Sequence, residues 1–123
     1  MIFGIGIDII EVARIRKAYT KLGKRFLSGV FTEAEQKFSL KHRDPAERLA
    51  ARWAAKEAVA KALGTGFARG VKPLDFEIID NERSRPTVNI KGKASNYLGQ
   101  MKVHLSISHI KDYATAVAVI EKE

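Results

Sequence analysis

The sequence contains no cysteine and no long run of apolar residues. The absence of cysteine excludes a disulfide framework, a thiolate metal site and a cysteine nucleophile. No apolar run approaches the ~20 residues that a helix needs to cross a bilayer, which excludes a membrane span. The first residues also lack the basic leader and cleavage site of a secretory signal. We therefore expect a cytoplasmic protein with no membrane partner.

Acidic residues are scarce: 14 Asp and Glu stand against 22 Lys and Arg, which leaves a net charge of +8. Such an excess predicts a negatively charged partner, such as nucleic acid, an anionic surface, a polyphosphate or an acidic protein. No acidic residue occurs from Val12 to Thr32. The basic residues in that stretch are Arg14, Arg16, Lys17, Lys21, Lys24 and Arg25. They form either a binding surface or a solvated helix face.

A chain of 123 residues is long enough to bury one core, so we expect a single domain over residues 1–123. Hydrophobic periodicity and turn signals predict the order β-α-α-α-β-β-α-β-β. The predicted strands are 2–10, 74–80, 86–91, 103–109 and 113–120, and the predicted helices are 11–22, one starting at 32, 44–63 and 93–101. This order is typical of an α+β domain with helices against one side of a mainly antiparallel sheet.

Two helix starts carry specific signals. Thr32 and Glu35 have the spacing of a capping box. Asp44 before Pro45 combines an acid at the N-cap with a proline at the first helical position. The helix that follows Pro45 is rich in alanine, which favours helix and close packing. It should end at Gly64, in the C-cap place.

The first predicted strand carries an acid among glycines. Gly4, Gly6 and Asp8 share one face of this strand, isoleucines occupy the other, and we expect the strand to be largely buried. The two glycines let a bulky group approach the backbone. A buried acid is costly unless it is paired or binds a metal. Asp8 is therefore either a Mg²⁺ ligand beside a second carboxylate and a phosphate, or a cap or salt-bridge partner.

The segment from Arg52 to Gly66 is the strongest local signal. Glu57 and Lys61 are four residues apart and share one helical face. Spacing alone favours an idle surface ion pair, but the surrounding alanines indicate a well-packed helix with little room for idle charges. The Gly64-Thr65-Gly66 turn would present backbone N–H groups and a hydroxyl to a phosphate. It is not a Walker loop, because its glycines follow the helix.

The strand from His104 to His109 places His104, Ser106 and Ser108 on one face. On an outer strand such a polar stripe faces water. Neighbours on one face of a strand lie ~7 Å apart, too far for a histidine to hold the proton of a serine nucleophile. This spacing disfavours a serine hydrolase.

Four blocks in order carry a resemblance to a known family. The blocks are Gly4–Glu11 with Arg14-Ile15, Phe31–Glu35, Arg52–Gly66, and His104–His109 with the alanine–valine strand after it. They resemble holo-(acyl-carrier-protein) synthases, the small single-domain type of 4′-phosphopantetheinyl transferase. The third block is highly specific, and the likeness spans residue 2 to about 120. The chain departs from the family at Ser84, where members often have glycine two places before the proline.

The resemblance implies an enzyme that transfers 4′-phosphopantetheine from coenzyme A to a serine of apo acyl carrier protein. Adenosine 3′,5′-bisphosphate would be released, and the reaction would support fatty acid biosynthesis. The resemblance also implies the 4′-phosphopantetheinyl transferase fold and a homotrimer with its active sites between neighbouring subunits.

Roles for individual residues follow from the same resemblance. Asp8 and Glu57 would hold Mg²⁺ against the pyrophosphate of the coenzyme, and Lys61 would contact a phosphate. Glu57, directly or through a metal-bound water, is the candidate base for the serine hydroxyl. The residues implied to bind coenzyme A are Arg52, Lys61, Gly64, Thr65, Gly66, His104 and Ser106. Those implied to dock the acidic carrier are Arg14, Lys21 and Lys24.

Two other functions are compatible with part of these observations. A basic nucleic-acid-binding module would use residues 14–25 and bind with a steep salt dependence. The chain has three Tyr, six Phe and one Trp, and Tyr19 alone lies within that stretch, which is too few for a stacking platform, so we expect no nucleic-acid partner. A trimeric scaffold that only binds nucleotide would keep the fold and lack catalysis.

Overall fold

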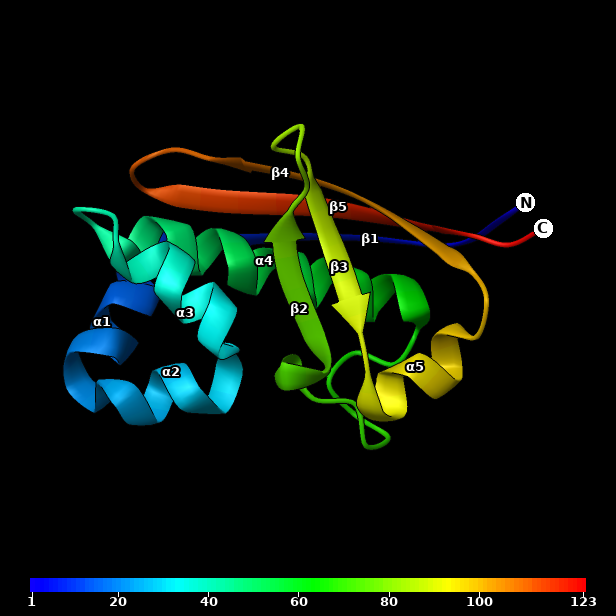
Figure 1. The fold of residues 1–123 in the computed structure, drawn as a ribbon, viewed down its shortest axis with the longest axis horizontal. Coiled ribbons are helices and arrows are strands. Elements are labelled where there is room, and N and C mark those ends of the chain that lie inside the picture. Colours follow the sequence, from blue (N-terminus) through cyan, green and yellow to red (C-terminus); the bar gives the residue numbers. More distant parts are fainter.

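A three-stranded antiparallel sheet and one long helix against it form the centre of the molecule (Figure 1). The computed structural model describes residues 1–123. The sheet has the order β1-β5-β4, with strands β1 (Ile2–Glu11), β5 (Tyr113–Glu121) and β4 (Lys102–His109). Helix α4 (Pro45–Leu63) packs on the inner face of this sheet, against all three strands. All remaining elements are arranged around this helix.

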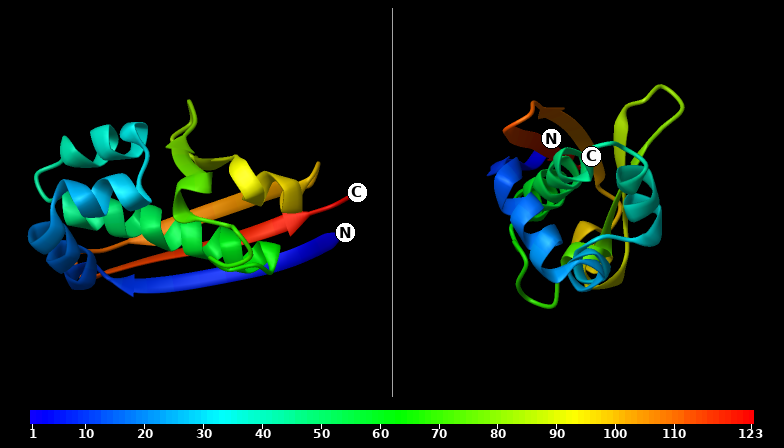
Figure 2. Two further views of the ribbon diagram at one scale, coloured as in Figure 1. Left: turned by 90° about the horizontal axis from the view of Figure 1, so that it is seen from below. Right: turned by 90° about the vertical axis from the view of Figure 1, so that its left-hand side faces the viewer.

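The other side of α4 is covered by two groups of elements (Figure 2). At one end lie α1 (Val12–Leu22), α2 (Lys24–Val30) and α3 (Glu33–Leu40). The second group comprises a 3₁₀ turn (Pro73–Asp75), the hairpin of β2 (Phe76–Asp80) and β3 (Pro86–Ile90), and α5 (Gly92–Leu98). None of the helices combines the length and apolar character that crossing a membrane requires.

Small residues let β1 lie directly on α4. The alanines of α4 are buried: Ala46, Ala50, Ala51, Ala54, Ala55, Ala58, Ala60 and Ala62. A Cβ atom added to Gly4 would collide with the carbonyl oxygen of Ala62, and one added to Gly6 with that of Ala58. The bulky group that these glycines admit is therefore the backbone of α4. Their absence of side chains brings Asp8, on the same face, to the surface of this helix.

The structure confirms the α+β class and the predicted elements, and it adds one helix. Helix α2 was not predicted, because its seven residues are too few to show a helical periodicity. The β2–β3 hairpin forms a separate two-stranded sheet. The expectation of one sheet is therefore wrong, although every strand pairing is antiparallel. The chain is one small α+β domain.

The three predicted helix ends are confirmed. Thr32 and Glu35 form the capping box in both directions, and Gly64 ends α4 with a φ of 87° in the left-handed region. Asp44 is the N-cap residue of α4 and Pro45 follows it at the helix start, as predicted, but the Asp44 side chain makes no capping hydrogen bond. Its carboxylate instead accepts a hydrogen bond from Arg16 at 2.6 Å, which ties the start of α4 to α1.

The outer face of the sheet is open to solvent in the single chain. The side chains of Phe3, Ile5, Ile7 and Ile9 are 46–68% exposed. The prediction of a largely buried β1 is therefore wrong for one chain, because α4 covers only the glycine face. Each isoleucine is in register with one residue of β5 and one of β4. Ile5 aligns with Val119 and His104, Ile7 with Val117 and Ser106, and Ile9 with Thr115 and Ser108. The outer face is thus apolar over β1 and polar over β4.

Candidate functional site

Asp8, Glu57 and Lys61 meet where β1 lies on α4. The Lys61 ammonium donates to Oδ1 of Asp8 at 3.2 Å and to the carbonyl of Ile7 at 2.9 Å. Glu57 lies close enough for the charges of Asp8 and Lys61 to act on its carboxyl group. The structure therefore brings together three residues that the sequence predicted. Lys61 forms its ion pair with Asp8 and not with Glu57, so the idle pair suggested by spacing alone is absent.

The electrostatics of this cluster make Glu57 a stronger base than an ordinary glutamate. Partial burial raises the pKa of Glu57, the Asp8 carboxylate raises it further, and Lys61 opposes both effects. A carboxylate with a raised pKa accepts a proton more readily at neutral pH. The group with the perturbed pKa is thus the residue proposed from the sequence as a base.

The donor set of the cluster suits Mg²⁺ only in combination with a phosphate. Asp8 and Glu57 supply carboxylate oxygens, which are the ligands that this ion prefers. No group of three or more His, Asp or Glu side chains lies close enough together to hold a metal by itself. Magnesium is commonly bound by one or two carboxylates, with water and substrate phosphates completing its shell. The two residues present fit that pattern.

The turn after α4 does not offer free backbone donors. The N–H groups of Gly64, Thr65 and Gly66 donate to carbonyls of Ala60 and Lys61. The Thr65 hydroxyl donates to the carbonyl of Gly66. The prediction that this turn presents these groups to a phosphate is therefore wrong. The last carbonyls of a helix need donors, and this turn supplies them.

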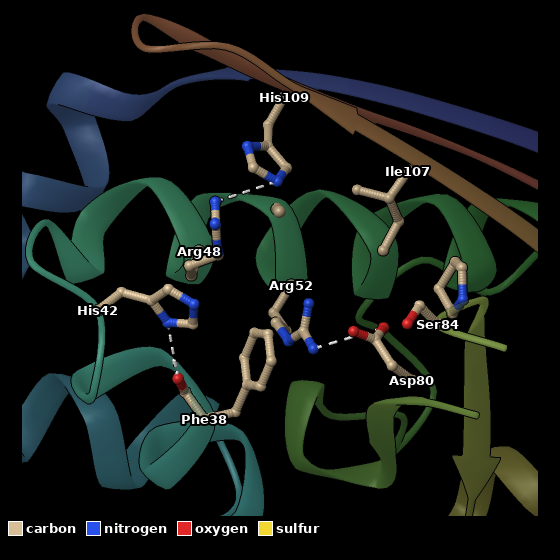
Figure 3. Close-up of a pocket in the computed structure, with 10 residues that line it drawn as sticks. Phe38, His42, Arg48, Arg52, Asp80, Ser84, Ile107 and His109 are labelled. Atoms are coloured by element: carbon tan, nitrogen blue, oxygen red, sulfur yellow. Dashed lines mark hydrogen bonds and ion pairs between the residues drawn. The ribbon is translucent and has the colours of Figure 1, made fainter. Parts of the chain in front are cut away.

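Arg52 faces a different part of the molecule, a cavity of about 270 Å³ between α3, α4, β4 and the β2–β3 hairpin, here called the Arg52 cavity (Figure 3). Its guanidinium lies 3.7 Å from Asp80 and 4.1 Å over the ring of Phe38. Burial lowers the pKa of Arg52, and Asp80 counteracts this shift. Asp8, Glu57 and Lys61 are not among the residues that line this cavity.

The Arg52 cavity has the character of an anion site. Its charged and titratable lining comprises Arg48, Arg52, His42, His109 and a single acid, Asp80, which is already paired with Arg52. Arg52 is only 5% exposed, and its Nε atom has no hydrogen-bond partner within the protein. A buried donor without a partner is costly, so the cavity favours a ligand that carries acceptor oxygens.

The hairpin turn beside this cavity keeps the geometry of a glycine turn at Ser84. The φ of Ser84 is 59°, in the left-handed region that side chains rarely adopt. The Asn81 side chain accepts hydrogen bonds from the backbone of Arg83 and Arg85, which holds the turn closed. The backbone at Ser84 thus adopts a conformation that glycine reaches most readily, and the turn places Ser84 in the cavity wall.

His104 and Ser106 lie on the outer face of β4, opposite the face that α4 covers. Both are exposed, and Nε2 of His104 lies 2.9 Å from Oε1 of Glu121. The predicted alternation along this strand is confirmed. Within one chain, however, these two residues do not reach the cluster of Asp8, Glu57 and Lys61, because the sheet lies between them and α4.

The predicted carrier-binding residues lie on an exposed basic surface. Arg14 and Lys21 are on α1 and Lys24 begins α2, whereas Val12 and Ile15 of α1 are buried. None of these three basic residues forms an ion pair with an acid of the chain. Their charges are therefore available to an external partner.

Sequence reasoning missed most of the Arg52 cavity. The residues not predicted for it include Phe38, His42, Arg48, Asp80 and His109. One signal was available, because Arg48 precedes Arg52 by four residues and therefore shares its helical face. The other residues come from separate segments, and only the tertiary fold brings them together.

Comparisons with known proteins agree with the geometry. The family model of the 4′-phosphopantetheinyl transferase superfamily matches residues 4–118. A holo-(acyl-carrier-protein) synthase of Protochlamydia amoebophila is 49% identical over 119 residues, covering 97% of this chain and 98% of that protein.

Solved structures show the same likeness in three dimensions. A holo-(acyl-carrier-protein) synthase from Neisseria meningitidis has a TM-score of 0.89 at 35% identity, covering 99% of this chain and 100% of that chain. One from Bacillus anthracis, in complex with CoA (3′,5′-ADP), has a TM-score of 0.85 at 39% identity, covering 100% of this chain and 99% of that chain. Sequence and fold agree over nearly the whole length, so the chain belongs to the 4′-phosphopantetheinyl transferase superfamily as an enzyme of the holo-(acyl-carrier-protein) synthase family.

Proposed function

We propose that this enzyme transfers the 4′-phosphopantetheine arm of coenzyme A to a serine of apo acyl carrier protein in the cytoplasm. Adenosine 3′,5′-bisphosphate is the second product, and the holo carrier serves fatty acid biosynthesis. The observation that carries this proposal is the cluster of Asp8, Glu57 and Lys61, in which a glutamate of raised pKa lies beside a second carboxylate and an ammonium group. The related Bacillus anthracis enzyme, solved in complex with CoA (3′,5′-ADP), supports the choice of coenzyme.

In the proposed reaction the serine hydroxyl oxygen bonds to the phosphorus that carries the pantetheine arm. The bond from that phosphorus to the bridging oxygen of the pyrophosphate breaks, and the oxygen leaves with the nucleotide. Glu57 accepts the serine proton, directly or through a water molecule. Lys61 places positive charge beside the phosphates as negative charge develops on the leaving oxygen.

Asp8 and Glu57 are the residues that would hold Mg²⁺. When bound, the ion neutralises charge on the pyrophosphate oxygens. Asp8 is held in place for this task by β1, whose glycine face lies on α4, and by the hydrogen bond that the Thr115 hydroxyl donates to its carbonyl at 2.7 Å. The ammonium of Lys61 donates to Oδ1 of Asp8 and so orients this carboxylate.

We propose that the nucleotide end of coenzyme A binds in the Arg52 cavity. The unpartnered Nε of Arg52 and the basic lining support this assignment. Gly64, Thr65 and Gly66 follow Lys61 at the end of α4 and would line the coenzyme cleft there, on the side of the cluster away from Arg52.

We further propose that the active enzyme is a homotrimer whose sites lie between subunits. An apolar face as exposed as that of β1 marks an interface in proteins that work in water. His104 and Ser106 lie on the same outer face, across the sheet from Ile5 and Ile7. A subunit docked there would receive these two residues at its own coenzyme site, which explains why one chain does not assemble them. Replacement of Ile7 by Asp should give a monomer by sedimentation that has lost transfer activity.

The exposed basic surface suits the acidic carrier. Reversal of charge at Arg14, Lys21 and Lys24 should raise the KM for the carrier and leave the KM for coenzyme A unchanged. Equal changes in both constants would assign these residues to the fold or to the nucleotide site.

A mass measurement tests the proposed function. The enzyme is incubated with coenzyme A, Mg²⁺ and apo acyl carrier protein, and the carrier should gain the mass of one phosphopantetheine. Glu57→Gln should abolish this gain without unfolding the protein, and near-normal modification by this variant at saturating Mg²⁺ would reject Glu57 as the base. No gain with several carriers, together with retention on nucleic acid, would favour the basic binding module instead.

A further inference from the structure

Glu47, Arg48 and His109 form a chain of polar contacts at the edge of the Arg52 cavity. Nδ1 of His109 lies 2.7 Å from Oε1 of Glu47, and Nε2 lies 3.3 Å from a terminal nitrogen of Arg48. Figure 3 shows the His109 ring on β4 above α4, with Arg48 reaching up to it. The three side chains are about one-quarter to one-third exposed. None of them was assigned a role by the sequence or by the proposed reaction.

The two partners of His109 determine where its proton lies. A carboxylate only accepts hydrogen bonds and a guanidinium only donates them. Nδ1 must therefore donate to Glu47, and the lone pair of Nε2 must accept from Arg48. His109 is thus a neutral imidazole that links the Glu47 carboxylate to the Arg48 guanidinium. A second proton on Nε2 would remove the acceptor and place two positive groups against each other.

Arg48 shares the cavity with Arg52, one helical turn away along α4. Two arginines in this arrangement repel each other, and the charge of Arg48 indeed acts to lower the pKa of Arg52. Asp80 is engaged with Arg52, and Arg48 lies 3.9 Å from Glu47, longer than a hydrogen bond. Each arginine thus has a carboxylate near it, but Arg48 donates no hydrogen bond to either acid, so most of its donors are free for a ligand.

We propose that Arg48 is a further anion-binding residue of the Arg52 cavity and that neutral His109, fixed by Glu47, is the positioning residue that holds it there. The proposal rests on the assignment of the nucleotide end of coenzyme A to this cavity. The chemistry that fits two guanidinium groups lining one cavity is a doubly charged phosphate monoester. In coenzyme A only the phosphate on the ribose is a monoester, because both pyrophosphate phosphorus atoms carry a second ester or anhydride bond.

The test compares coenzyme A with 3′-dephospho-coenzyme A, which lacks that monoester. Arg48→Gln should raise the KM for coenzyme A about tenfold, as expected for a lost charge-assisted hydrogen bond, with little change in kcat. It should leave the KM for dephospho-coenzyme A unchanged. Lys37→Gln removes the same charge from the exposed surface of α3, outside the cavity, and should alter neither constant.

Two variants of His109 separate positioning from packing. In His109→Gln the side-chain oxygen reaches the place of Nε2 and still accepts from Arg48, so the KM for coenzyme A should stay within about threefold of the original. In His109→Asn the side chain reaches only the place of Nδ1, so the KM should rise as in Arg48→Gln. The double variant Arg48→Gln/His109→Asn should show no further rise, because both changes break one interaction.

Three results would overturn the proposal. They are an equal rise in KM for both coenzymes, equal behaviour of the Gln and Asn variants at position 109, and additive effects in the double variant. Calorimetric titration of each variant with adenosine 3′,5′-bisphosphate measures nucleotide binding without catalysis, so it tests the anion site independently of the proposed reaction. If no transfer occurs, weaker binding of this nucleotide by Arg48→Gln and His109→Asn still supports the anion site, and unchanged binding rejects it.

Discussion

Helix α4 carries two lysine–carboxylate pairs that differ mainly in burial. Lys56 lies 2.8 Å from Glu35, and Lys61 lies 3.2 Å from Asp8. Both side chains of the first pair are fully buried, whereas Lys61 is 49% exposed and Asp8 is 16% exposed. The same two functional groups, five residues apart on one helix, therefore sit in very different surroundings.

The Lys56 ammonium of the buried pair has three partners inside the protein, and both Glu35 oxygens are engaged there. The Lys56 ammonium also donates to the carbonyls of Pro73 and Phe76, at 3.0 and 2.5 Å. Glu35 accepts from the backbone of Thr32 and, at 2.8 Å, of Ile78. Burial lowers the pKa of Lys56, and the Glu35 carboxylate opposes that shift. The pair joins α3, α4 and β2, which form the walls of the Arg52 cavity, and it has no group left for a substrate.

The cluster around the exposed pair keeps part of its hydrogen-bonding capacity free. Lys61 makes two contacts with β1, and Glu57 beside it has no hydrogen bond to another side chain of the protein. Water reaches this cluster, so a phosphate or a metal ion displaces solvent there and not a packed side chain. Ion pairs of identical chemistry thus serve structure where every donor is satisfied and chemistry where some are not.

The largest expected effect is on stability, at the buried pair. Lys56→Met should lower the free energy of unfolding by about 3–5 kcal/mol, because it leaves the Glu35 carboxylate buried without a counter-charge. Urea unfolding measures this loss. In Lys56→Met/Glu35→Gln the charge is removed but an acceptor for the backbone is kept, so part of the stability should return. A loss below about 1 kcal/mol in the single variant would mean that the pair is not structural.

The next effect should appear in activity, at the exposed pair. Lys61→Met should lower kcat for carrier modification about 100-fold, which corresponds to about 2.7 kcal/mol. Its free energy of unfolding should change by less than about 1 kcal/mol, because exposed ion pairs contribute little. The same urea titration and the mass-gain assay give both values. A stability loss as large as that of Lys56→Met would remove the distinction between the two pairs.

Local sequence signals predicted the secondary structure and the members of the exposed cluster. The capping box at Thr32, the end of α4 at Gly64 and the alternation of β4 depend on neighbouring residues, and all three are confirmed. Asp8 and Lys61 were identified through the glycines of β1 and the alanines of α4. Those small residues also cause the two elements to pack together.

Features that depend on tertiary contacts were not predictable in this way. Lys56 shows no sequence sign of its partner, because Glu35 lies on another helix and reaches it only after folding. The exposed isoleucine face of β1 is also non-local, since its burial depends on what packs there. The N–H groups of Gly64 to Gly66 were misjudged because the hydrogen-bond needs of the helix end were not considered.

A smaller effect is expected in the pH dependence of stability, at Glu57 beside the exposed pair. The pKa of Glu57 is raised in the folded chain above its ordinary value of 4.5. Between these two values the unfolded chain has released a proton that the folded chain still holds, so stability falls as pH rises through this window. In metal-free buffer Glu57→Gln should therefore be more stable than the original chain at neutral pH, and this gain should vanish below pH 4.5.

Urea titrations at a series of pH values measure this difference, with Glu82→Gln on the exposed hairpin turn as the matched control. A gain that persists undiminished in acid would assign the effect to packing and not to the charge of Glu57.

The smallest effect is expected from the shortest of the ion pairs compared here. Arg16 and Asp44 approach to 2.6 Å, closer than either pair on α4, but both side chains are 46% exposed. Arg16→Gln should therefore lower the free energy of unfolding by less than about 0.5 kcal/mol, and this loss should disappear at about 1 M salt, where the screening length is only about 3 Å. Urea titrations at low and high salt measure both quantities. A loss above about 1 kcal/mol that persists at high salt would mean that contact distance determines how much each pair contributes to stability. We expect the closest pair to contribute least to stability, which requires that burial and not distance determines the contribution.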